Sequence, residues 1–396
     1  MKIKLAVLFG GKSTEHEISV ISAIQAISSL DKDKYDVFPI YITKSNEMFI
    51  GENIGRIESY TDINVLLKKS QRIILVNENE KTYIVKYPMK VLSKSIVNSI
   101  DVVLPIVHGT NVEDGNLQGY LNMLDVPYVG CDVLSSAIGM DKYIMKVVLK
   151  ANGIPVLDCK RYSEDYYYGD SDVMIEDIKR SFPYPVIVKP INLGSSIGIS
   201  KVSNDEELIE ALDLGFTFTQ TVIIETFIQN LKEINCSVIG DHTQAEASEC
   251  EEPINAEEIL SFNGKYISGN KSKNNSSKGM ASLQRKIPAQ ISELNKNRIQ
   301  ELAVRAFMCL GCNGISRIDF LIDTQSDTIW LNEINTIPGS LSFYLWEPGG
   351  LKYSALLDKI INLALKRNRE QERIIYSFDS NVLSGALLSG QKGAKS

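Results

Sequence analysis

The N-terminal third of the chain alternates apolar runs with amphipathic segments. Residues 3–9 form an apolar run that only Lys4 interrupts, which is typical of a strand buried on both faces of a parallel sheet. The next segment has the three-residue apolar spacing of a helix with one buried stripe, at Ile18, Ile21, Ile24 and Ile27. Further strands are predicted at 36–42 and 101–107. The pattern predicts a doubly wound α/β domain, whose ligands collect at the carboxyl ends of the strands.

Local signals predict several boundaries. Thr14 and Glu17 have the spacing of a capping box, which predicts that a helix begins there. Apolar segments at 73–76 and 82–85 flank a short polar stretch and predict a hairpin. One helix is predicted over 135–151, because a glycine and then a proline follow it.

The rest of the chain mixes strands and helices without an internal repeat, which indicates an α+β C-terminal part. Strands are predicted at 186–189, 197–201, 222–226, 234–239, 315–322 and 329–334, and helices at 204–214, 292–309 and 353–367. A length of 396 residues is too great for one ordinary core. We predict an organisation into 1–134, 135–232 and 233–375, followed by a tail over 376–396.

Composition narrows the class of protein. The chain is 44% hydrophobic and 23% charged, as a soluble globular protein is, and its net charge of −7 argues against a general nucleic-acid or membrane-surface binder. No apolar run approaches the roughly 18 residues that span a bilayer, and the start of the chain lacks a signal-peptide pattern. Six cysteines show no disulfide framework. These features predict a cytoplasmic protein.

The strongest chemical signal is a set of oxygen-bearing side chains on two predicted strands. Glu333 and Asn335 are two residues apart, so their side chains leave the same face, and Asp319 lies on the preceding strand. Carboxylate and amide oxygens are ligands that Mg²⁺ prefers. A solvated polar face is the alternative. It fits poorly because the flanking residues are strongly apolar and buried carboxylates need a cation or other partners.

Two lysines are candidates for phosphate binding. Lys142 lies early in a predicted helix, and Lys189 ends an apolar strand. The small residues of 194–198, including Ser195 and Ser196, could cover phosphates with backbone N–H groups and hydroxyls. Taken singly, each lysine is more often a surface side chain, and the loop an ordinary turn. The loop lies only a few residues after Lys189, which favours the functional interpretation.

Further candidates lie at strand ends. Glu15 and His108 follow two strands of one predicted sheet, so both should reach one crevice. Glu15 alone is also explained as a favourable anion in the first turn of a helix. Glu225 and Glu233 could accept hydrogen bonds from an adenosine ribose, although each by itself resembles a surface carboxylate.

Seven blocks in order resemble the D-alanine–D-alanine ligase family of the ATP-grasp superfamily, over about residues 3–368. The blocks are Phe9-Gly10-Gly11 with Glu15-His16-Glu17-Ile18-Ser19, His108–Gly115, Met140-Asp141-Lys142, Val188-Lys189-Pro190, Gly194-Ser195-Ser196, Arg317-Ile318-Asp319 and Asn332–Gly339. The resemblance implies an N-terminal substrate domain followed by the two-part ATP-grasp fold. It also implies a homodimer.

The resemblance implies roles for individual residues. Lys142, Lys189, Ser196 and Lys265 would contact ATP phosphates, with Glu225 and Glu233 on the adenosine. Asp319, Glu333 and Asn335 would hold two Mg²⁺ ions, for which Mn²⁺ could substitute. Glu15, His108 and Ser195 would orient the first amino acid, and Tyr266 would help to hold Glu15. Arg317 and the backbone N–H of Gly339 would stabilise the tetrahedral oxyanion.

These roles suit a ligase that makes a D-alanyl-D-alanine-type dipeptide for peptidoglycan through an acylphosphate. A carboxylate acylates poorly until phosphorylated, and cations must neutralise the two anions that meet. Water would destroy the intermediate, so a lid is needed, and the long polar loop over 264–286 is suited to that task.

The sequence departs from the family pattern at three places. Val112 replaces a usual glycine, and residues 249–258 and the lid are longer than usual. Tyr344 stands about where the family carries a serine for the second substrate, with Ser342 nearby. Two alternatives therefore stay open: a ligase that uses D-serine, D-lactate or another acceptor, and a nucleotide-binding regulator with weak catalysis. The complete set of Arg317, Asp319, Glu333 and Asn335 argues against the regulator.

Overall fold

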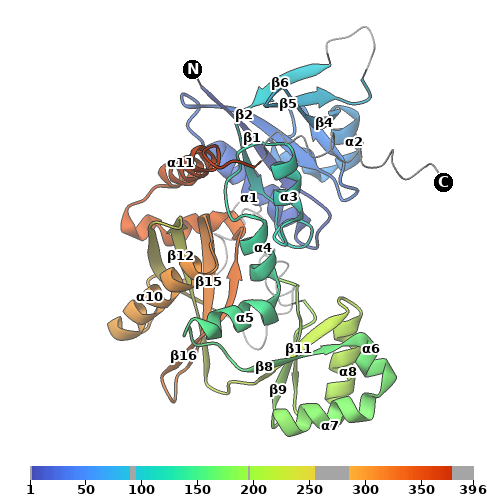
Figure 1. Ribbon diagram of the computed structural model, residues 1–396, viewed down its shortest axis with the longest axis vertical. Coiled ribbons are helices and arrows are strands. Elements are labelled where there is room, and N and C mark those ends of the chain that lie inside the picture. Colours follow the sequence, from blue (N-terminus) through green and yellow to red (C-terminus); the bar gives the residue numbers. More distant parts are fainter. Residues whose placement is uncertain (1, 90–94, 195–196, 255–284, 377–396) are drawn as a thin grey trace, which may run out of the picture.

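The computed structural model describes residues 2–89, 95–194, 197–254 and 285–376. Within these residues the strands form three sheets along the long axis of the molecule, and the third sheet in chain order lies between the first and the second (Figure 1). Three apolar cores accompany these sheets, one for each sheet. The predicted boundaries at 134 and 232 stay predictions, as does the tail, of which 377–396 lie outside the described residues.

The first sheet is mixed rather than wholly parallel. Its order is β6-β5-β4-β3-β2-β1-β7, and only β2, β1 and β7 run parallel. The parallel strands are β1 Ile3–Gly10, β2 Tyr35–Ile42 and β7 Val102–Ile106. The antiparallel extension is β3 Met48–Ile50, β4 Gln71–Glu78, β5 Lys81–Lys86 and β6 Ile96–Ile100. The hairpin predicted from 73–76 and 82–85 is confirmed by the β4–β5 pairing.

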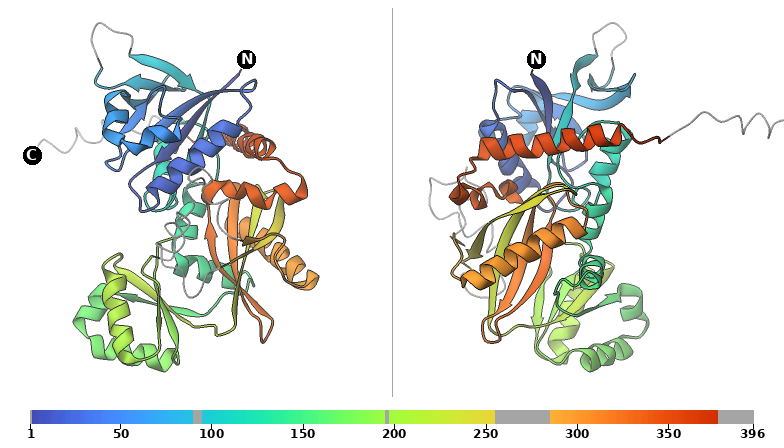
Figure 2. Two further views of the ribbon diagram at one scale, coloured as in Figure 1. Left: turned by 180° about the vertical axis from the view of Figure 1, so that it is seen from behind. Right: turned by 60° about the vertical axis from the view of Figure 1, so that its left-hand side comes forward.

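Helices from both ends of the chain cover this sheet. The helices are α1 His16–Ser29, α2 Ile63–Lys68, α3 Asn116–Met123 and α11 Tyr353–Gln371, with the 3₁₀ turn η1 Ile57–Thr61. Leu356 and Ile360 of α11 belong to the same core as Leu5 of β1, although more than 350 residues separate them along the chain. Figure 2 shows α11 lying against the N-terminal region from two further sides.

The predicted capping box is wrong. Glu15 is the residue that precedes α1, and no side chain caps the helix. The Glu17 carboxylate, which the box requires, instead accepts a hydrogen bond from Lys44 Nζ at 2.7 Å. A competing ion pair therefore replaces the local hydrogen bond that the spacing suggested.

The second sheet is antiparallel, with the order β10-β9-β11-β8. Its strands are β8 Cys159–Ser163, β9 Val186–Pro190, β10 Ser200–Val202 and β11 Thr221–Thr226. Helices α6 Glu164–Gly169, α7 Ser171–Ser181 and α8 Asp205–Phe216 accompany it. Val188, Leu208 and Leu212 share its core, so the helices bury one face and leave the other for the cleft.

The third sheet has the order β14-β13-β12-β15-β16 and is also antiparallel. Its strands are β12 Leu231–Gly240, β13 Ala245–Pro253, β14 Arg285–Lys286, β15 Gly314–Asp323 and β16 Thr328–Asn335. Helix α10 Glu293–Cys309 packs on one face through Ile299, Leu302 and Phe307. The opposite face carries the polar side chains described below.

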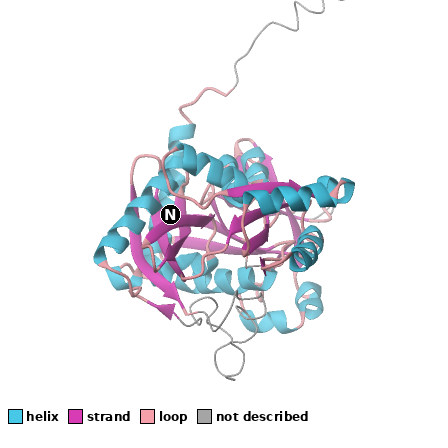
Figure 3. Ribbon diagram, turned by 90° about the horizontal axis from the view of Figure 1, so that it is seen from below, coloured by secondary structure: helices cyan, strands magenta, loops and turns pink. Residues whose placement is uncertain are grey.

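The predicted helix over 135–151 is two helices. Helix α4 Val133–Met140 ends before Asp141, whose carboxylate accepts hydrogen bonds from the N–H groups of Tyr143 and Ile144. Asp141 is therefore the N-cap of α5 Lys142–Ala151, and an N-cap requires non-helical backbone. The break places Lys142 at the first position of a new helix. Figure 3 gives the arrangement of helices and strands from below.

Candidate active site

A polar row crosses the third sheet from β13 to β16. The pairing registers join Glu251 to Asn235, Asn235 to Asp319, and Asp319 to Glu333. Paired residues lie on one face of a sheet, so four neighbouring strands direct these side chains to the same side. The buried Ile318 and Ile334 lie on the other face, against α10. The alternation predicted for Glu333 and Asn335 thus extends over the sheet.

A β-bulge on β16 changes that alternation at one point. Asp319 pairs with Glu333, but Phe320 pairs with Leu331, so Asn332 is an extra residue. Leu331 consequently returns to the apolar core, where it is fully buried. The Asn332 amide oxygen accepts a hydrogen bond from Lys189 Nζ at 3.2 Å. The bulge thus adds a cleft-facing side chain next to Glu333.

Arg317 and Asp319 form a bidentate pair on β15. Arg317 Nε and Nη2 each donate to Asp319 at 2.7 Å, and Asn335 Nδ2 donates to the same carboxylate at 3.0 Å. Burial raises the pKa of Asp319 to about 6, although Arg317 acts in the opposite direction. Burial would lower the pKa of Arg317, but the Asp319 charge outweighs it and raises that pKa. The arginine therefore stays charged at the centre of the row.

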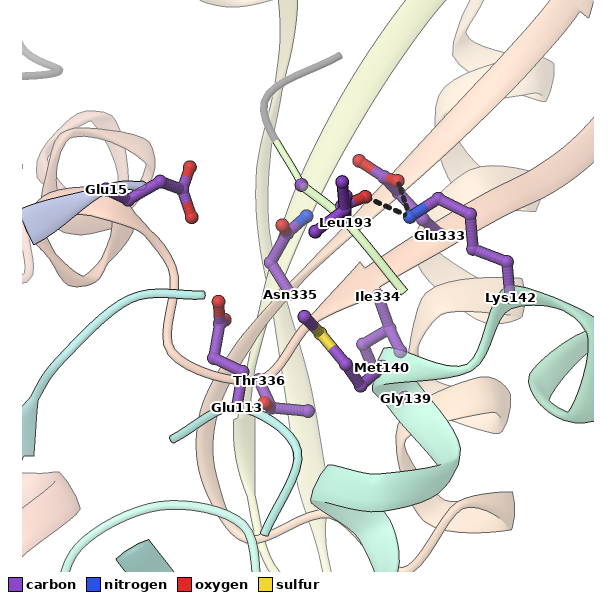
Figure 4. Close-up of a pocket in the computed structure, with 11 residues that line it drawn as sticks. Glu15, Glu113, Gly139, Met140, Lys142, Leu193, Glu333, Ile334, Asn335 and Thr336 are labelled. Carbon is purple, nitrogen blue, oxygen red and sulfur yellow. Dashed lines mark hydrogen bonds and ion pairs between the residues drawn. The ribbon is translucent and has the colours of Figure 1, made fainter. Parts of the chain in front are cut away.

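Lys142 lies between two elements of the cleft. Its Nζ donates to the Leu193 carbonyl oxygen at 2.7 Å and lies 3.3 Å from Glu333 Oε2 (Figure 4). Its side chain is nearly buried at 9% exposure. The new helix that begins at Lys142 and the loop after β9 thus hold one ammonium group beside the end of the polar row.

Glu225 of the second sheet forms ion pairs with two lysines. Its carboxylate pairs with Lys189 of β9 and with Lys146 of α5, and its side chain is only 1% exposed. Burial would raise the pKa of Glu225, but the two lysine charges lower it to about 2. Burial opposes the charge on Lys189, whose pKa is nevertheless raised because Glu225 is adjacent. Lys189 therefore stays cationic and fixed in position.

His108 joins the N-terminal domain to the loop after β16. Its Nδ1 lies 2.8 Å from the Ile337 carbonyl oxygen and its Nε2 lies 3.1 Å from Ser22 Oγ. Burial lowers the pKa of His108, although the Glu15 charge acts the other way, so the ring is neutral and Nδ1–H donates to the carbonyl. Ser22 Oγ in turn accepts a hydrogen bond from the Ser340 N–H at 3.0 Å. The histidine fixes this loop in place.

Glu113 makes a second connection between the same regions. Its carboxylate accepts hydrogen bonds from the N–H groups of Gly109 at 2.7 Å and Ile337 at 3.1 Å. Burial and then the Glu15 charge raise the pKa of Glu113 to about 8. The backbone at Gly109 approaches Glu15 so closely that an added Cβ would lie 3.3 Å from its carboxylate. Glu15, Glu113 and Gly109 are thus one tightly packed corner.

The turn η4 Gly339–Leu345 closes the other end of the row. Ser340, Leu341 and Ser342 have φ angles of 51°, 50° and 47°, a left-handed conformation that costs about 1–2 kcal/mol for each residue. Strain of this kind is typical of functional sites that the surrounding structure holds. Ser342 is fully buried, and its Oγ has no hydrogen-bond partner among the described residues. Tyr344 donates to Glu251 Oε1 at 3.3 Å.

The chain is similar to known proteins over almost its whole length. The family described as D-ala D-ala ligase N-terminus matches residues 4–131, and the family described as D-ala D-ala ligase C-terminus matches residues 148–362. A D-alanine–D-alanine ligase of Thermosipho melanesiensis is 39% identical over 96% of this chain and 98% of its own length. One of Caldicellulosiruptor bescii is 39% identical over 95% and 99%.

The chain belongs to the D-alanine–D-alanine ligase family.

Solved structures of the family have the same fold. The D-alanine–D-alanine ligase of Coxiella burnetii superposes with a TM-score of 0.76 at 30% identity, over 94% of this chain and 98% of that one. The VanG D-Ala:D-Ser ligase of Enterococcus faecalis gives a TM-score of 0.73 at 31% identity, over 92% and 100%. The predicted combination of an α/β domain with the ATP-grasp fold is therefore confirmed. Among the described residues, none of the helices has the length and apolar character to cross a membrane.

The cleft of this family member lies where the three sheets meet. It encloses about 400 Å³, partly open to solvent, and Figure 4 shows Glu15 and Glu113 at one side and Lys142 and Glu333 at the other. The structure thus brings Glu15, Lys142, Glu333 and Asn335 around one space. Ser195, Ser196, Lys265, Tyr266 and most of the predicted lid lie outside the described residues.

The donor set in this cleft fits Mg²⁺. Asp319, Glu333 and Asn335 offer carboxylate and amide oxygens on two paired strands. Cationic side chains, Arg317 and Lys142, lie against the two carboxylates, as buried anions require. These side chains therefore suit divalent cations that arrive together with nucleotide phosphates.

Sequence reasoning missed three residues of the site. Lys146 lies one helical turn after Lys142, a spacing that could have drawn attention to it. Glu113 stands two residues after Asn111 in a loop that follows a strand. Only its tertiary contacts show that it joins this loop to the loop after β16. Asn332 depends on the bulge, for which the sequence gives no signal.

Proposed function

We propose that this protein joins two molecules of D-alanine at the expense of ATP, for peptidoglycan precursor synthesis. The observation that carries the proposal is the polar row with its cations: Arg317, Asp319 and Glu333 on paired strands, with Lys142 and Lys189 beside them. The side chains Lys142, Lys189, Glu225 and Glu333 are called the phosphate end below. The side chains Glu251, Arg285 and Tyr344 with Ser340–Ser342 are called the acceptor end.

The phosphate end is suited to ATP. Lys142 and Lys189 would contact phosphate oxygens, and Glu225, which also pairs with Lys146, holds Lys189 in position. Asp319, Glu333 and Asn335 would hold Mg²⁺, which when bound neutralises phosphate charge. Glu233 lies on the same strand and face as Asn235, and we assign it to the adenosine. The contact of Glu225 with the ribose stays a prediction, as do the assignments of Ser196 and Lys265.

The first step is phosphorylation of a carboxylate. A carboxylate oxygen of the first D-alanine attacks the γ-phosphorus of ATP, the bond to the β-phosphate oxygen breaks, and ADP leaves. Glu15 would hold the ammonium group of that amino acid, with Ser195 and Tyr266 as further predicted contacts. The ring of His108 supports the loop on which the substrate would lie.

The second step joins the two amino acids. The amine of the acceptor, after loss of a proton, attacks the acyl carbon, and phosphate leaves with the oxygen it received. Negative charge develops on the carbonyl oxygen, and preorganised donors lower the energy of that state. Arg317 and the backbone N–H of Gly339 are our assignment for these donors. Exclusion of water by residues of the predicted lid would protect the acylphosphate.

The test is identification of the product. The purified protein, ATP, Mg²⁺ and D-alanine should release phosphate and give D-alanyl-D-alanine by mass spectrometry. L-Alanine in place of D-alanine should give neither. Absence of phosphate release and of any dipeptide would contradict the proposal and favour the nucleotide-binding regulator.

A second candidate concerns the acceptor alone. Tyr344 departs from the family pattern at the acceptor end, and a D-Ala:D-Ser ligase is among the similar structures. Equimolar D-alanine, D-serine and D-lactate should therefore be offered together. A predominance of D-alanyl-D-alanine supports the first candidate, whereas a predominance of a mixed product supports the second.

A further inference from the structure

Glu251 lies at the end of the polar row opposite to Glu333 and has partners on both oxygens. Oε1 accepts hydrogen bonds from Asn235 Nδ2 at 2.9 Å and from the Tyr344 hydroxyl at 3.3 Å. Oε2 pairs with Arg285 Nη1 at 2.8 Å, and the Glu251 side chain is 3% exposed. A buried carboxylate with partners on both oxygens fixes the groups that bind it. Glu251 therefore fixes where Arg285 lies.

The Arg285 guanidinium also lies on an aromatic face. Its Cζ is 3.9 Å from the centroid of the Tyr344 ring, within the range of a strong cation–π contact. Stacking and the ion pair together restrict the guanidinium to one orientation, so little conformational entropy is lost when a further anion binds. Arg285 is thus a preorganised cation rather than a mobile surface side chain.

Arg285 and Arg317 belong to one electrostatic neighbourhood. Glu251 lies on β13 and Arg317 on β15, two strand spacings apart, which is roughly 10 Å. The turn η4, which carries Tyr344, packs against both of these strands. Arg285 stacks on Tyr344 of that turn, so both arginines belong to the surroundings of η4. The phosphate end lies beyond Arg317, on the opposite side from Arg285.

We propose that Arg285, oriented by Glu251 and Tyr344, binds the carboxylate of the acceptor amino acid. This assignment rests on the proposed function. The acceptor amine attacks one face of the acyl carbon beside Arg317, and the part of the row that lies away from the phosphate end leads to Arg285. D-alanine, D-serine and D-lactate all carry a carboxylate, and a planar guanidinium matches its two oxygens. Arg285 selects a carboxylate, and the surroundings of Tyr344 select the side chain.

The test is an internal competition between two acceptors. D-alanine at a fixed concentration serves as donor, and D-alaninamide, which lacks the carboxylate, competes with D-alanine as acceptor. The ratio of D-alanyl-D-alanine to its amide, measured by mass spectrometry, reports acceptor selection and is independent of ATP binding and of the donor step. We expect Arg285→Ala to lower the preference for the carboxylate acceptor roughly 10- to 100-fold.

Two further variants make the result decisive. Lys286→Ala removes the neighbouring cation, whose side chain is 41% exposed, and should leave the ratio unchanged. Arg285→Lys keeps a charge for Glu251 if Arg285→Ala fails to fold, and it should lower the ratio by a smaller factor because the planar fork is lost. An unchanged ratio in a folded Arg285 variant would overturn the assignment. Absence of both products with the unmodified protein would overturn the proposed function itself.

Discussion

The phosphate end and the acceptor end of the cleft are built in different ways. The phosphate end consists of charges on strands and at a helix start, and Glu225, Lys189 and Lys142 are paired and almost buried. The acceptor end consists of a 3₁₀ turn with three left-handed residues and a guanidinium stacked on Tyr344. The residues assigned to phosphate therefore lie on regular strands and helices, whereas the residues assigned to selection of the acceptor depend on a strained turn.

Removal of one proposed Mg²⁺ ligand should have the largest effect on turnover. We expect Glu333→Ala to lower kcat by roughly 10³-fold, because several kcal/mol of charge stabilisation at the phosphate would be lost. Phosphate release at saturating ATP and D-alanine measures it. Glu347→Ala, at an exposed carboxylate of the turn after η4, is the matched control. Near-normal turnover of Glu333→Ala in Mg²⁺ would contradict the metal assignment.

Loss of the buried Glu225 should damage the fold itself. Glu225→Ala leaves Lys146 and Lys189 without their shared carboxylate, and breaking a buried pair costs about 3–5 kcal/mol. The free energy of unfolding from urea denaturation measures this. Glu17→Ala breaks an ion pair whose side chains are 61% and 65% exposed, and should cost at most about 1 kcal/mol. Equal losses of unfolding free energy in the two variants would contradict the larger contribution expected from the buried ion pairs.

Lys189 should matter for the nucleotide more than for the fold. We expect Lys189→Ala to weaken ATP binding roughly 10- to 100-fold, because a charged hydrogen bond to phosphate is lost. Lys146 still neutralises Glu225 in this variant. Isothermal titration with ATP and Mg²⁺ gives the affinity. An unchanged Kd would show that Lys189 has only a structural role.

The corner at Glu113 should give the stability a pH dependence. Its pKa is raised from about 4.5 to about 8, so the folded state binds more protons than the unfolded state between these values. The free energy of unfolding from this group therefore falls as the pH rises through that window. The advantage of the unmodified protein over Glu113→Gln should shrink between pH 5 and 8, as denaturant midpoints would show. A growing advantage would contradict the raised pKa.

The smallest effect on stability is expected at Ser342. Its buried hydroxyl has no partner among the described residues, so Ser342→Ala should change the free energy of unfolding by less than about 1 kcal/mol. If the hydroxyl binds the acceptor, the KM for the second D-alanine should rise while ATP affinity stays constant. A stability loss without any change of KM would instead assign Ser342 to the fold.

Regular periodicity explains why much of the phosphate end could be predicted from sequence. Glu333 and Asn335 follow from strand alternation, and Lys189 follows from its place at the end of an apolar run. Asn332 could not be predicted, because a bulge is fixed by the pairing of Phe320 with Leu331 rather than by local sequence. The break at Asp141 was missed because helical periodicity continues across it.

The acceptor end was less predictable for a related reason. The sequence marks Tyr344 as unusual but does not show that Arg285 and Glu251, distant along the chain, lie against it. Left-handed φ angles at Ser340 and Leu341 contradict local preference, and hydrogen bonds such as that from Ser340 Oγ to Gln25 Oε1, at 2.8 Å, hold the turn. The antiparallel extension of the first sheet likewise depends on long-range pairing.

The central claim is that the cleft activates a carboxylate by transferring phosphate to it, and isotope transfer tests this most directly. D-Alanine labelled with ¹⁸O in both carboxylate oxygens would be incubated with the protein, ATP and Mg²⁺, and the released phosphate examined by mass spectrometry. The account predicts one ¹⁸O atom in the phosphate for each dipeptide formed. Unlabelled phosphate accompanying the dipeptide would contradict it.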